Sequence, residues 1–289
     1  MHLDPYLRLM RLDRPVGTLL LLWPTLAALW LAAGGLPSAV LLAVFVLGTF
    51  LMRSAGCVIN DIADRNVDPH VERTRNRPLA TGEVGLGEAL GLFAALCVMA
   101  ASLLLFLNDA ARLLAAAGLG VAVVYPFLKR WTNLPQLALG IAFSWGILMA
   151  FAAVTETVPP AGWVLFAASA AWIVAYDTLY AMTDRDDDLS IGIKSTAILL
   201  GRHDRAAVGI LQAGTLAGFA ALGFIYSFGW WYAAGLAAIL GLFGYQQRLI
   251  RRREPAACFK AFRNNTWVGF SLFAAVTIEL SVWPALAAA

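Results

Sequence analysis

Residues 38–58 read SAVLLAVFVLGTFLMRSAGCV, an apolar stretch with a single charged residue, Arg53. A helix needs about 20 consecutive apolar residues to cross the hydrocarbon core of a bilayer. Inside that core every backbone polar group has to be satisfied within the segment itself. The stretch therefore predicts a transmembrane helix.

Runs of this kind recur along the chain and predict an all-α, multi-pass membrane protein with about nine transmembrane helices. The composition agrees, because 61% of the 289 residues are hydrophobic and 13% are charged, whereas soluble domains are about 25% charged. We expect one membrane-embedded domain over residues 1–289. The expected spans are 16–33, 38–58, 87–107, 111–128, 135–154, 161–181, 206–227, 229–247 and 266–286.

The basic residues indicate the orientation of these spans. With nine spans, all but two of the 21 Lys and Arg residues fall on the side of the N-terminus. The two exceptions are Arg53, inside a span, and Arg112, on the opposite face. Because cytoplasmic loops are enriched in Lys and Arg, we expect a cytoplasmic N-terminus. The same distribution explains the basic pI without a nucleic-acid partner.

Two long polar loops, 59–86 and 182–205, are predicted on the cytoplasmic side. Half of the 18 acidic residues lie in two short windows at these loops, Asp61 to Glu72 and Asp177 to Asp188. The first loop begins Asn60-Asp61-Ile62-Ala63-Asp64-Arg65-Asn66-Val67-Asp68. Helical spacing places either Asn60, Asp64 and Asp68 or Asp61, Asp64 and Asp68 on one face. The second cluster places Asp177, Asp184 and Asp188 on one face in the same way.

Carboxylates stacked one helical turn apart repel each other, and a hard cation relieves the repulsion. Magnesium takes oxygen ligands and typically joins one or two carboxylates to substrate phosphates. The two acidic clusters therefore indicate a clamp for a magnesium-bound diphosphate. The alternative is that both clusters are solvated loop acids at the membrane edge.

Cationic residues that would bind phosphate oxygens follow both clusters. Arg77 follows the first, Lys194 follows the second, and Lys129 ends the fourth span on the same side. Topology alone also predicts basic residues in these loops, so that explanation stays open. Arg53 is different, because an arginine inside a span is costly and indicates function. It precedes Asn60 by seven residues, and we expect both side chains to point into the same cavity.

Two segments carry a family resemblance: Asn60 to Gly82, NDIADRNVDPHVERTRNRPLATG, and Ala175 to Gly201, AYDTLYAMTDRDDDLSIGIKSTAILLG. They resemble the signature loops of the UbiA superfamily of intramembrane prenyltransferases, most closely the branch that acts on 4-hydroxybenzoate. RLDRPVGTLLLLWPT at Arg11 to Thr25 and YPFLKR at Tyr125 to Arg130 resemble the same branch.

The resemblance implies helices around a central cavity capped by the two cytoplasmic loops, in a bacterial inner (cytoplasmic) membrane. It implies transfer of a polyprenyl chain from polyprenyl diphosphate to the ring of 4-hydroxybenzoate, ortho to the hydroxyl, in ubiquinone biosynthesis. The cofactor would be Mg²⁺, and membrane lipid would surround the protein. By resemblance, the residues that serve the metal and the diphosphate are Asn60, Asp64, Asp68, Asp184 and Asp188.

The resemblance also sets an expectation for the acceptor. Its carboxylate would need a cationic partner, for which Arg53 is the first candidate and Arg14 the second. Tyr180 and Tyr125 are candidates for stabilising a prenyl carbocation, although tyrosine at a helix end is often an interface anchor.

Three alternatives remain at this point. A membrane CDP-alcohol phosphotransferase also uses clustered aspartates, but its single DGxxAR-type pattern is absent. A divalent-cation transporter would place carboxylates near the membrane midplane, where this chain has only Glu279. Within the superfamily, homogentisate, dihydroxynaphthoate or haem would be other acceptors.

Overall fold

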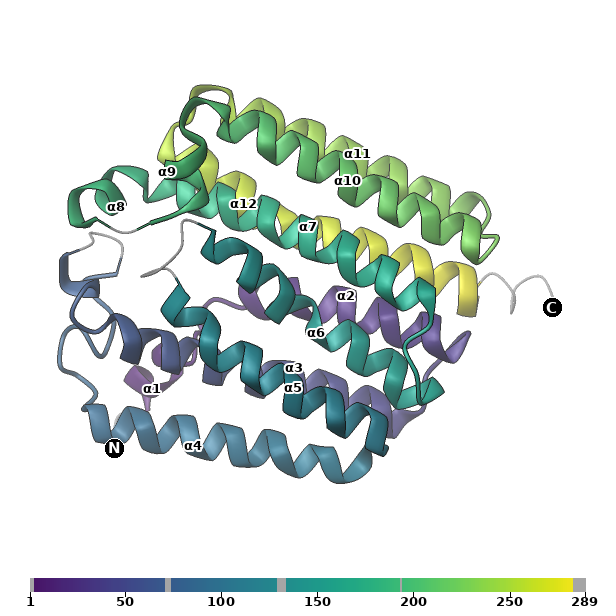
Figure 1. Ribbon diagram of the computed structural model, residues 1–289, viewed down its shortest axis with the longest axis horizontal. Coiled ribbons are helices and arrows are strands. Elements are labelled where there is room, and N and C mark those ends of the chain that lie inside the picture. The colour runs from purple at the N-terminus through teal and green to yellow at the C-terminus, as the bar shows by residue number, and fades with distance from the viewer. Residues whose placement is uncertain (1–2, 71–73, 129–133, 193, 283–289) are drawn as a thin grey trace.

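The computed structural model describes residues 3–70, 74–128, 134–192 and 194–282, and these ranges contain helices and no strand (Figure 1). Long helices run side by side and form a single bundle. Their bounds are α2 (Val16–Ala33), α3 (Ala39–Asp64), α4 (Leu86–Leu103), α5 (Asp109–Leu128), α6 (Pro135–Thr155), α7 (Pro160–Thr183), α10 (Asp204–Ile225), α11 (Trp230–Leu249) and α12 (Pro255–Thr277).

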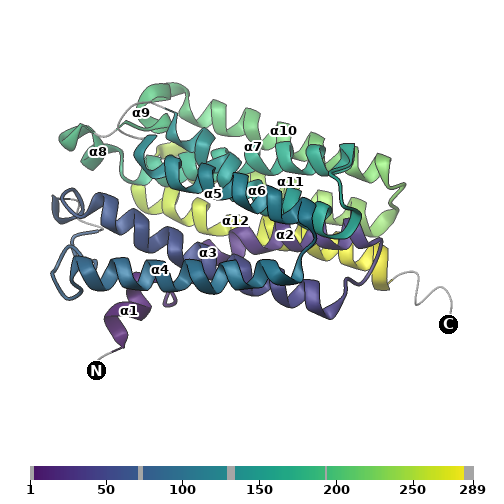
Figure 2. The same ribbon diagram turned by 60° about the horizontal axis from the view of Figure 1, so that its bottom comes forward.

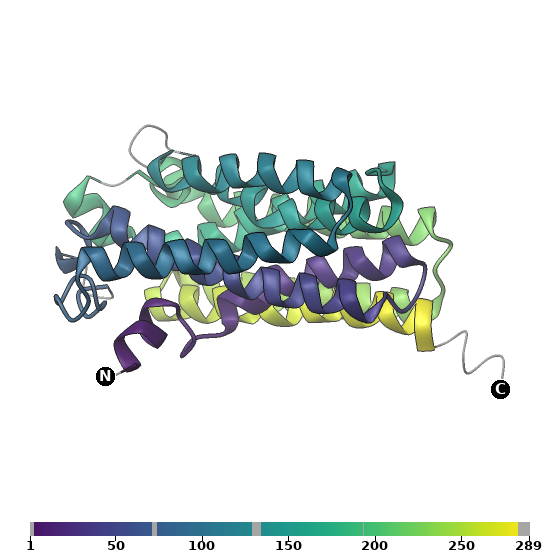
Figure 3. The same cartoon turned by 90° about the horizontal axis from the view of Figure 1, so that it is seen from below.

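Short elements gather at one end of the bundle, where α1 also lies (Figures 2 and 3). They connect the long helices on the side that the sequence predicts to be cytoplasmic. The helical elements are α1 (Asp4–Leu9), α8 (Arg185–Ile191) and α9 (Thr196–Leu200). The 3₁₀ turns are η1 (Asp68–His70), η2 (Leu104–Phe106), η3 (Gly201–His203) and η4 (Ile250–Arg252). Of these, η2 lies at the opposite end of the bundle, between α4 and α5. A π-helical turn, η5 (Ile278–Val282), follows α12.

Seven helical segments in the described ranges are long and apolar enough to cross a membrane. The chain is thus an all-α, multi-pass membrane protein, as the sequence predicts. The count of nine is approximate: α5 and α11 have the length of a span, 20 residues each, but are not among the seven. In α11 the last turn carries Gln246, Gln247 and Arg248, which lower its apolar character.

Helix α7 lies at the centre of the bundle, packed against α6, α10 and α12. Its buried side chains include Trp172, whose indole N–H donates to Asn265 Oδ1 on α12 at 2.8 Å. On α6, a Cβ at Gly140 would come within 2.9 Å of the carbonyl oxygen of Ala170 on α7. Such small residues let membrane helices approach closely, which favours van der Waals packing between them. This packing matters because lipid tails are themselves apolar, so the hydrophobic effect does not drive helices together.

The carboxylate of Glu279, the one acidic residue deep in a predicted span, has a structural role. Its Oε1 accepts the backbone N–H of Tyr232 at 2.9 Å, in the first turn of α11. The first N–H groups of a helix have no partner within the helix, and a carboxylate satisfies them. Glu279 therefore caps a neighbouring helix.

Candidate active site

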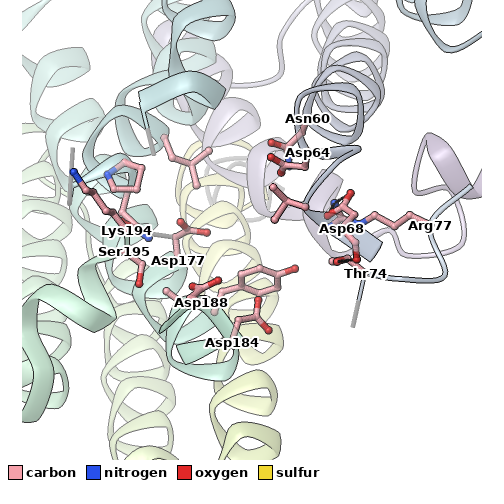
Figure 4. Close-up of a pocket in the computed structure, with 16 residues that line it drawn as sticks. Asn60, Asp64, Asp68, Thr74, Arg77, Asp177, Asp184, Asp188, Lys194 and Ser195 are labelled. Atoms are coloured by element: carbon pink, nitrogen blue, oxygen red, sulfur yellow. Dashed lines mark hydrogen bonds and ion pairs between the residues drawn. The ribbon is translucent and has the colours of Figure 1, made fainter. Parts of the chain in front are cut away.

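A cavity of about 230 Å³ lies between the end of α3 and the junction of α7 and α8, and we call it the acidic cavity (Figure 4). Both predicted acidic clusters line it, from opposite sides. Its polar lining residues are Asn60, Asp64, Asp68, Thr74, Arg77, Gln136, Asp177, Tyr180, Asp184, Asp188, Lys194 and Ser195.

The first cluster comes from the end of α3 and the turn that follows. Asn60 and Asp64 stand one helical turn apart on α3, and the helix ends at Asp64. The expectation that Asp68 continues the same helical face is wrong, because Asp68 begins the separate turn η1. The loop nevertheless returns Asp68 to the cavity, so the set Asn60, Asp64 and Asp68 faces it. Asp61 points elsewhere and is 1% exposed.

Arg77 anchors the first cluster. Its Nη1 donates to Asp68 Oδ1 at 3.0 Å and Oδ2 at 2.9 Å, and it also lies 3.0 Å from Asp61 Oδ1. Burial lowers the pKa of Arg77, but the surrounding carboxylates outweigh this and keep its pKa above the ordinary value. Arg77 is therefore a fixed cation at the edge of the cavity.

The Asp68 carboxyl responds to its surroundings in the opposite way. Burial raises its pKa, and the carboxylates of Asp61 and Asp64 raise it further, against the lowering effect of Arg77. A carboxylate in this position is under-compensated even with its arginine partner. A second cation near Asp68 would favour its ionised form.

The second cluster is divided between two helices. Asp177 lies on α7, and Asp188 lies on α8. Asp184 stands between them as the residue that ends one helix and precedes the other, so the expected single helical face is wrong. Asp177, Asp184 and Asp188 face the first cluster across the acidic cavity (Figure 4).

The donor set suits a hard divalent cation. The lining carboxylates and the Asn60 amide are oxygen ligands, which Mg²⁺ prefers. Among the described residues, no group of three or more His, Cys, Asp or Glu side chains stands close enough together to hold a metal ion by itself. An arrangement of carboxylates on two facing sides instead suits an ion that takes its remaining ligands from phosphate and water.

A second cavity, of about 310 Å³, is apolar and is enclosed by α2 to α6; we call it the apolar cavity. It follows the acidic cavity along the same two helices. On α3 the lining passes from Asn60 to Gly56, and on α6 from Gln136 to Phe143. Met52 and Leu119 line it and are 38% and 49% exposed, so the cavity reaches the surface of the bundle.

The structure places Arg53 in the apolar cavity, so the expectation that it shares the cavity of Asn60 is wrong. Its guanidinium carbon lies 5.6 Å from the centre of the Phe143 ring. A Cβ at Gly17 on α2 would stand 2.5 Å from Arg53 Nη2, so the missing side chain makes room for the guanidinium.

The other predicted cations differ in position. Arg77 and Lys194 line the acidic cavity. Arg14 does not: its side chain is 72% exposed and lies 3.3 Å from Asp13. Lys129 lies outside the described residues, so its predicted role is untested.

Three further polar residues of the acidic cavity were not predicted from the sequence. Thr74 donates from its hydroxyl to the backbone oxygen of Asp68 at 3.0 Å. Ser195 caps α9, and Gln136 Oε1 accepts the backbone N–H of Thr196 at 3.2 Å. A serine or threonine before a short apolar run signals a helix cap, but nothing in the sequence places that cap at the wall of the acidic cavity.

The sequence and the fold have known counterparts. The model of the UbiA prenyltransferase family matches residues 21–284. This chain belongs to the UbiA prenyltransferase family.

Two curated relatives share more than half of the residues. The 4-hydroxybenzoate octaprenyltransferase of Coxiella burnetii is 55% identical over 94% of this chain and 95% of its own. The 4-hydroxybenzoate octaprenyltransferase of Shewanella piezotolerans is 53% identical over 97% of this chain and 98% of its own.

Solved structures have the same fold. A UbiA homolog from Aeropyrum pernix superposes with a TM-score of 0.80 at 27% identity, over 90% of this chain and 97% of that one. A UbiA homolog from Archaeoglobus fulgidus bound to GPP and Mg²⁺ superposes with a TM-score of 0.72 at 20% identity, over 93% and 99%.

Proposed function

We propose that this protein transfers a polyprenyl chain from polyprenyl diphosphate to 4-hydroxybenzoate, at the ring carbon ortho to the hydroxyl, and releases diphosphate, in ubiquinone biosynthesis. The observation that carries the proposal is the meeting of two acidic clusters across one cavity beside an apolar cavity. The names of the relatives at 53–55% identity support the choice of donor and acceptor.

The acidic cavity suits the diphosphate head of the donor. Asn60, Asp64 and Asp68 on one side and Asp184 and Asp188 on the other would hold Mg²⁺. Bound Mg²⁺ would neutralise the negative charge that grows on the leaving diphosphate as the allylic C–O bond breaks. The pairing of oxygen donors on two facing walls supports this assignment.

Arg77 and Lys194 stand at the same cavity and would bind the phosphate oxygens directly. Cations aimed at developing negative charge stabilise the transition state without reorganising during the reaction. Because Arg77 is already held by Asp61 and Asp68, little entropy is lost when it engages the diphosphate. We assign Arg77 as the main residue that donates hydrogen bonds to the diphosphate.

The prenyl tail would occupy the apolar cavity. An amphipathic donor fits the pair of cavities, since the charged head and the apolar tail find matching surroundings along α3 and α6. Its length would extend into lipid past Met52 and Leu119. The water-poor walls protect the carbocation from being quenched.

The acceptor would bind with its carboxylate at Arg53 and its ring near the junction of the two cavities. Among the described residues that line the apolar cavity, Arg53 carries the one positive charge. A half-buried guanidinium in apolar surroundings favours an anionic ligand. Tyr180 lines the acidic cavity, and its ring would stabilise the prenyl cation. Asp184 or Asp188 would orient the phenol or accept its proton.

The expected setting is the bacterial inner membrane, with the acidic cavity on the cytoplasmic face. Lys and Arg residues cluster at the end of the bundle that holds the acidic cavity, which supports a cytoplasmic position for this end. A divalent-cation transporter fits less well, because the deep carboxylate of Glu279 caps α11 and lines neither cavity.

The acceptor is tested by supplying membranes that contain the protein with Mg²⁺, a short prenyl diphosphate and one aromatic acceptor at a time. We expect a prenylated product from 4-hydroxybenzoate, identified by mass spectrometry, and little from homogentisate or dihydroxynaphthoate. A product from one of the latter and none from 4-hydroxybenzoate would overturn the choice of acceptor while leaving prenyl transfer in place.

A further inference from the structure

Each acidic cluster is tied to a buried aspartate that does not line the acidic cavity. On the first side this residue is Asp61, whose side chain is 1% exposed. Both of its oxygens accept from Arg11 Nη2 at 2.8 Å, and Oδ1 also lies 3.0 Å from Arg77 Nη1. Arg77 in turn binds Asp68 in the cavity wall. A chain of charges therefore runs from the N-terminal segment to a cluster residue.

The second side repeats this arrangement with unrelated residues. Asp204, at the start of α10, is 0% exposed. It accepts from Arg185, which follows Asp184 in the chain, and from Arg253 Nε at 2.9 and 3.2 Å. Arg185 also donates to the backbone oxygen of Ala197 at 2.9 Å. The second cluster is therefore attached to α10 through one buried carboxylate.

The outer arginine of each set adopts an unusual backbone conformation. Arg11 has φ 59° and Arg253 has φ 56°, two of the four non-glycine residues with positive φ in the described ranges. Both follow the end of a short helix, a position that glycine normally fills because a side chain is strained there. In each case the guanidinium donates hydrogen bonds to the buried aspartate. This contact explains why arginine is present at a position suited to glycine.

We propose that Asp61 and Asp204 are positioning residues, each a buried carboxylate between two arginines that holds one acidic cluster in place to bind magnesium diphosphate. Arg11 and Arg253 complete the two anchors from outside. The inference rests on the proposed function for the identity of the ligand. Asp61 thus has a different role from Asn60, Asp64 and Asp68, although all four belong to one short motif.

The test uses Arg11→Gly and Arg253→Gly in the full-length protein purified in detergent. Glycine fits a positive φ, so each change removes the guanidinium without adding backbone strain. We expect each variant to fold but to unfold at a lower temperature than the wild type, because the buried aspartate keeps only one of its two arginines. The affinity for inorganic diphosphate with Mg²⁺, measured by calorimetric titration, should fall by about tenfold, as for loss of a charged hydrogen-bond partner.

Steady-state kinetics separates positioning from a general loss of folded protein. The KM for prenyl diphosphate should rise in both variants while the KM for 4-hydroxybenzoate stays unchanged, because only the diphosphate site is disturbed. General damage would instead lower kcat alone. Arg252→Gly is the matched control for Arg253→Gly: it is the adjacent residue, 85% exposed, and its ion partner Glu254 lies 4.0 Å away at the surface.

A double-mutant cycle shows whether Asp61 acts through Arg77. If it does, Asp61→Asn should weaken diphosphate binding in the wild type and add little in an Arg77→Ala background. Additive losses would mean that Asp61 contacts the ligand itself and would overturn the proposal.

Unchanged affinity for magnesium diphosphate in folded Arg11→Gly and Arg253→Gly would overturn the proposal as well. If either glycine variant fails to fold, Arg11→Lys and Arg253→Lys replace it with the same expected loss. Failure of the wild-type protein to bind magnesium diphosphate would instead count against the proposed function.

Discussion

Arg77 and Asp68 form a two-point contact at the rim of the acidic cavity, in which one guanidinium nitrogen lies 3.0 and 2.9 Å from the two carboxylate oxygens. The pair places a cation and a proposed metal ligand side by side at the place where a diphosphate would bind.

Replacing Arg77 by alanine should lower kcat/KM for prenyl diphosphate by about a hundredfold, the loss typical of removing one donor to a developing oxyanion. Steady-state kinetics in detergent or membranes measures the effect. Arg75→Ala is the control, since Arg75 belongs to the same loop but is exposed and does not line the cavity. Equal losses in both variants would show that the loop needs only its net charge.

Four aspartates lie between residues 184 and 188, and two of them, Asp184 and Asp188, line the acidic cavity. Asp188→Asn should reduce transfer by about a hundredfold or more, because it removes a candidate metal ligand. Asp186→Asn should retain near wild-type activity, because Asp186 is exposed and lies outside the cavity lining. The ratio of initial rates at saturating Mg²⁺ compares the two. Similar behaviour of the two variants would refute the assignment.

Burial and neighbouring carboxylates raise the pKa of Asp68. Its protonated form therefore persists to higher pH than for an ordinary carboxyl, and protons compete with the metal. We expect the Mg²⁺ concentration for half-maximal activity to increase as the pH falls through the raised pKa of Asp68. Asp68→Asn should flatten this dependence. A wild-type requirement for Mg²⁺ that is constant from pH 8 to pH 5 would contradict the prediction.

The acceptor assignment separates Arg53 from Arg14. Arg53→Gln should raise the KM for 4-hydroxybenzoate by about tenfold, the loss expected for a hydrogen bond to a charged group, with little change in the KM for prenyl diphosphate. Arg14→Gln should leave both constants near wild type, because Arg14 is exposed and paired with Asp13. The reverse pattern would move the acceptor carboxylate to Arg14.

Much of this site is encoded locally. Apolar runs of about 20 residues predict the membrane helices, and the spacing of Asn60, Asp64 and Asp68 predicts that they meet. The helix breaks at Asp64 and Asp184 were not predicted. The sequence pattern fits one continuous helix equally well, and the break depends on how the loop packs against the rest of the bundle.

Longer-range relationships were beyond sequence reasoning. Arg11 and Asp61 are 50 residues apart, and Arg253 and Asp204 are 49 apart. Which arginine meets which aspartate is decided by helix packing. The position of Arg53 illustrates the same limit, since helical spacing places it on the side of Asn60 but cannot tell that two separate cavities lie along that side.

The two facing acidic clusters are proposed to catalyse a metal-dependent transfer, and the products of a single reaction mixture show whether they do. Purified protein in lipid vesicles is given 4-hydroxybenzoate and a short prenyl diphosphate, with Mg²⁺ or with EDTA, and prenylated product and released diphosphate are both quantified for the wild type and Asp184→Ala. We expect equal amounts of the two products from the wild type with Mg²⁺, and almost none with EDTA or from a folded Asp184→Ala protein. Undiminished transfer without the metal, or by Asp184→Ala, would contradict it.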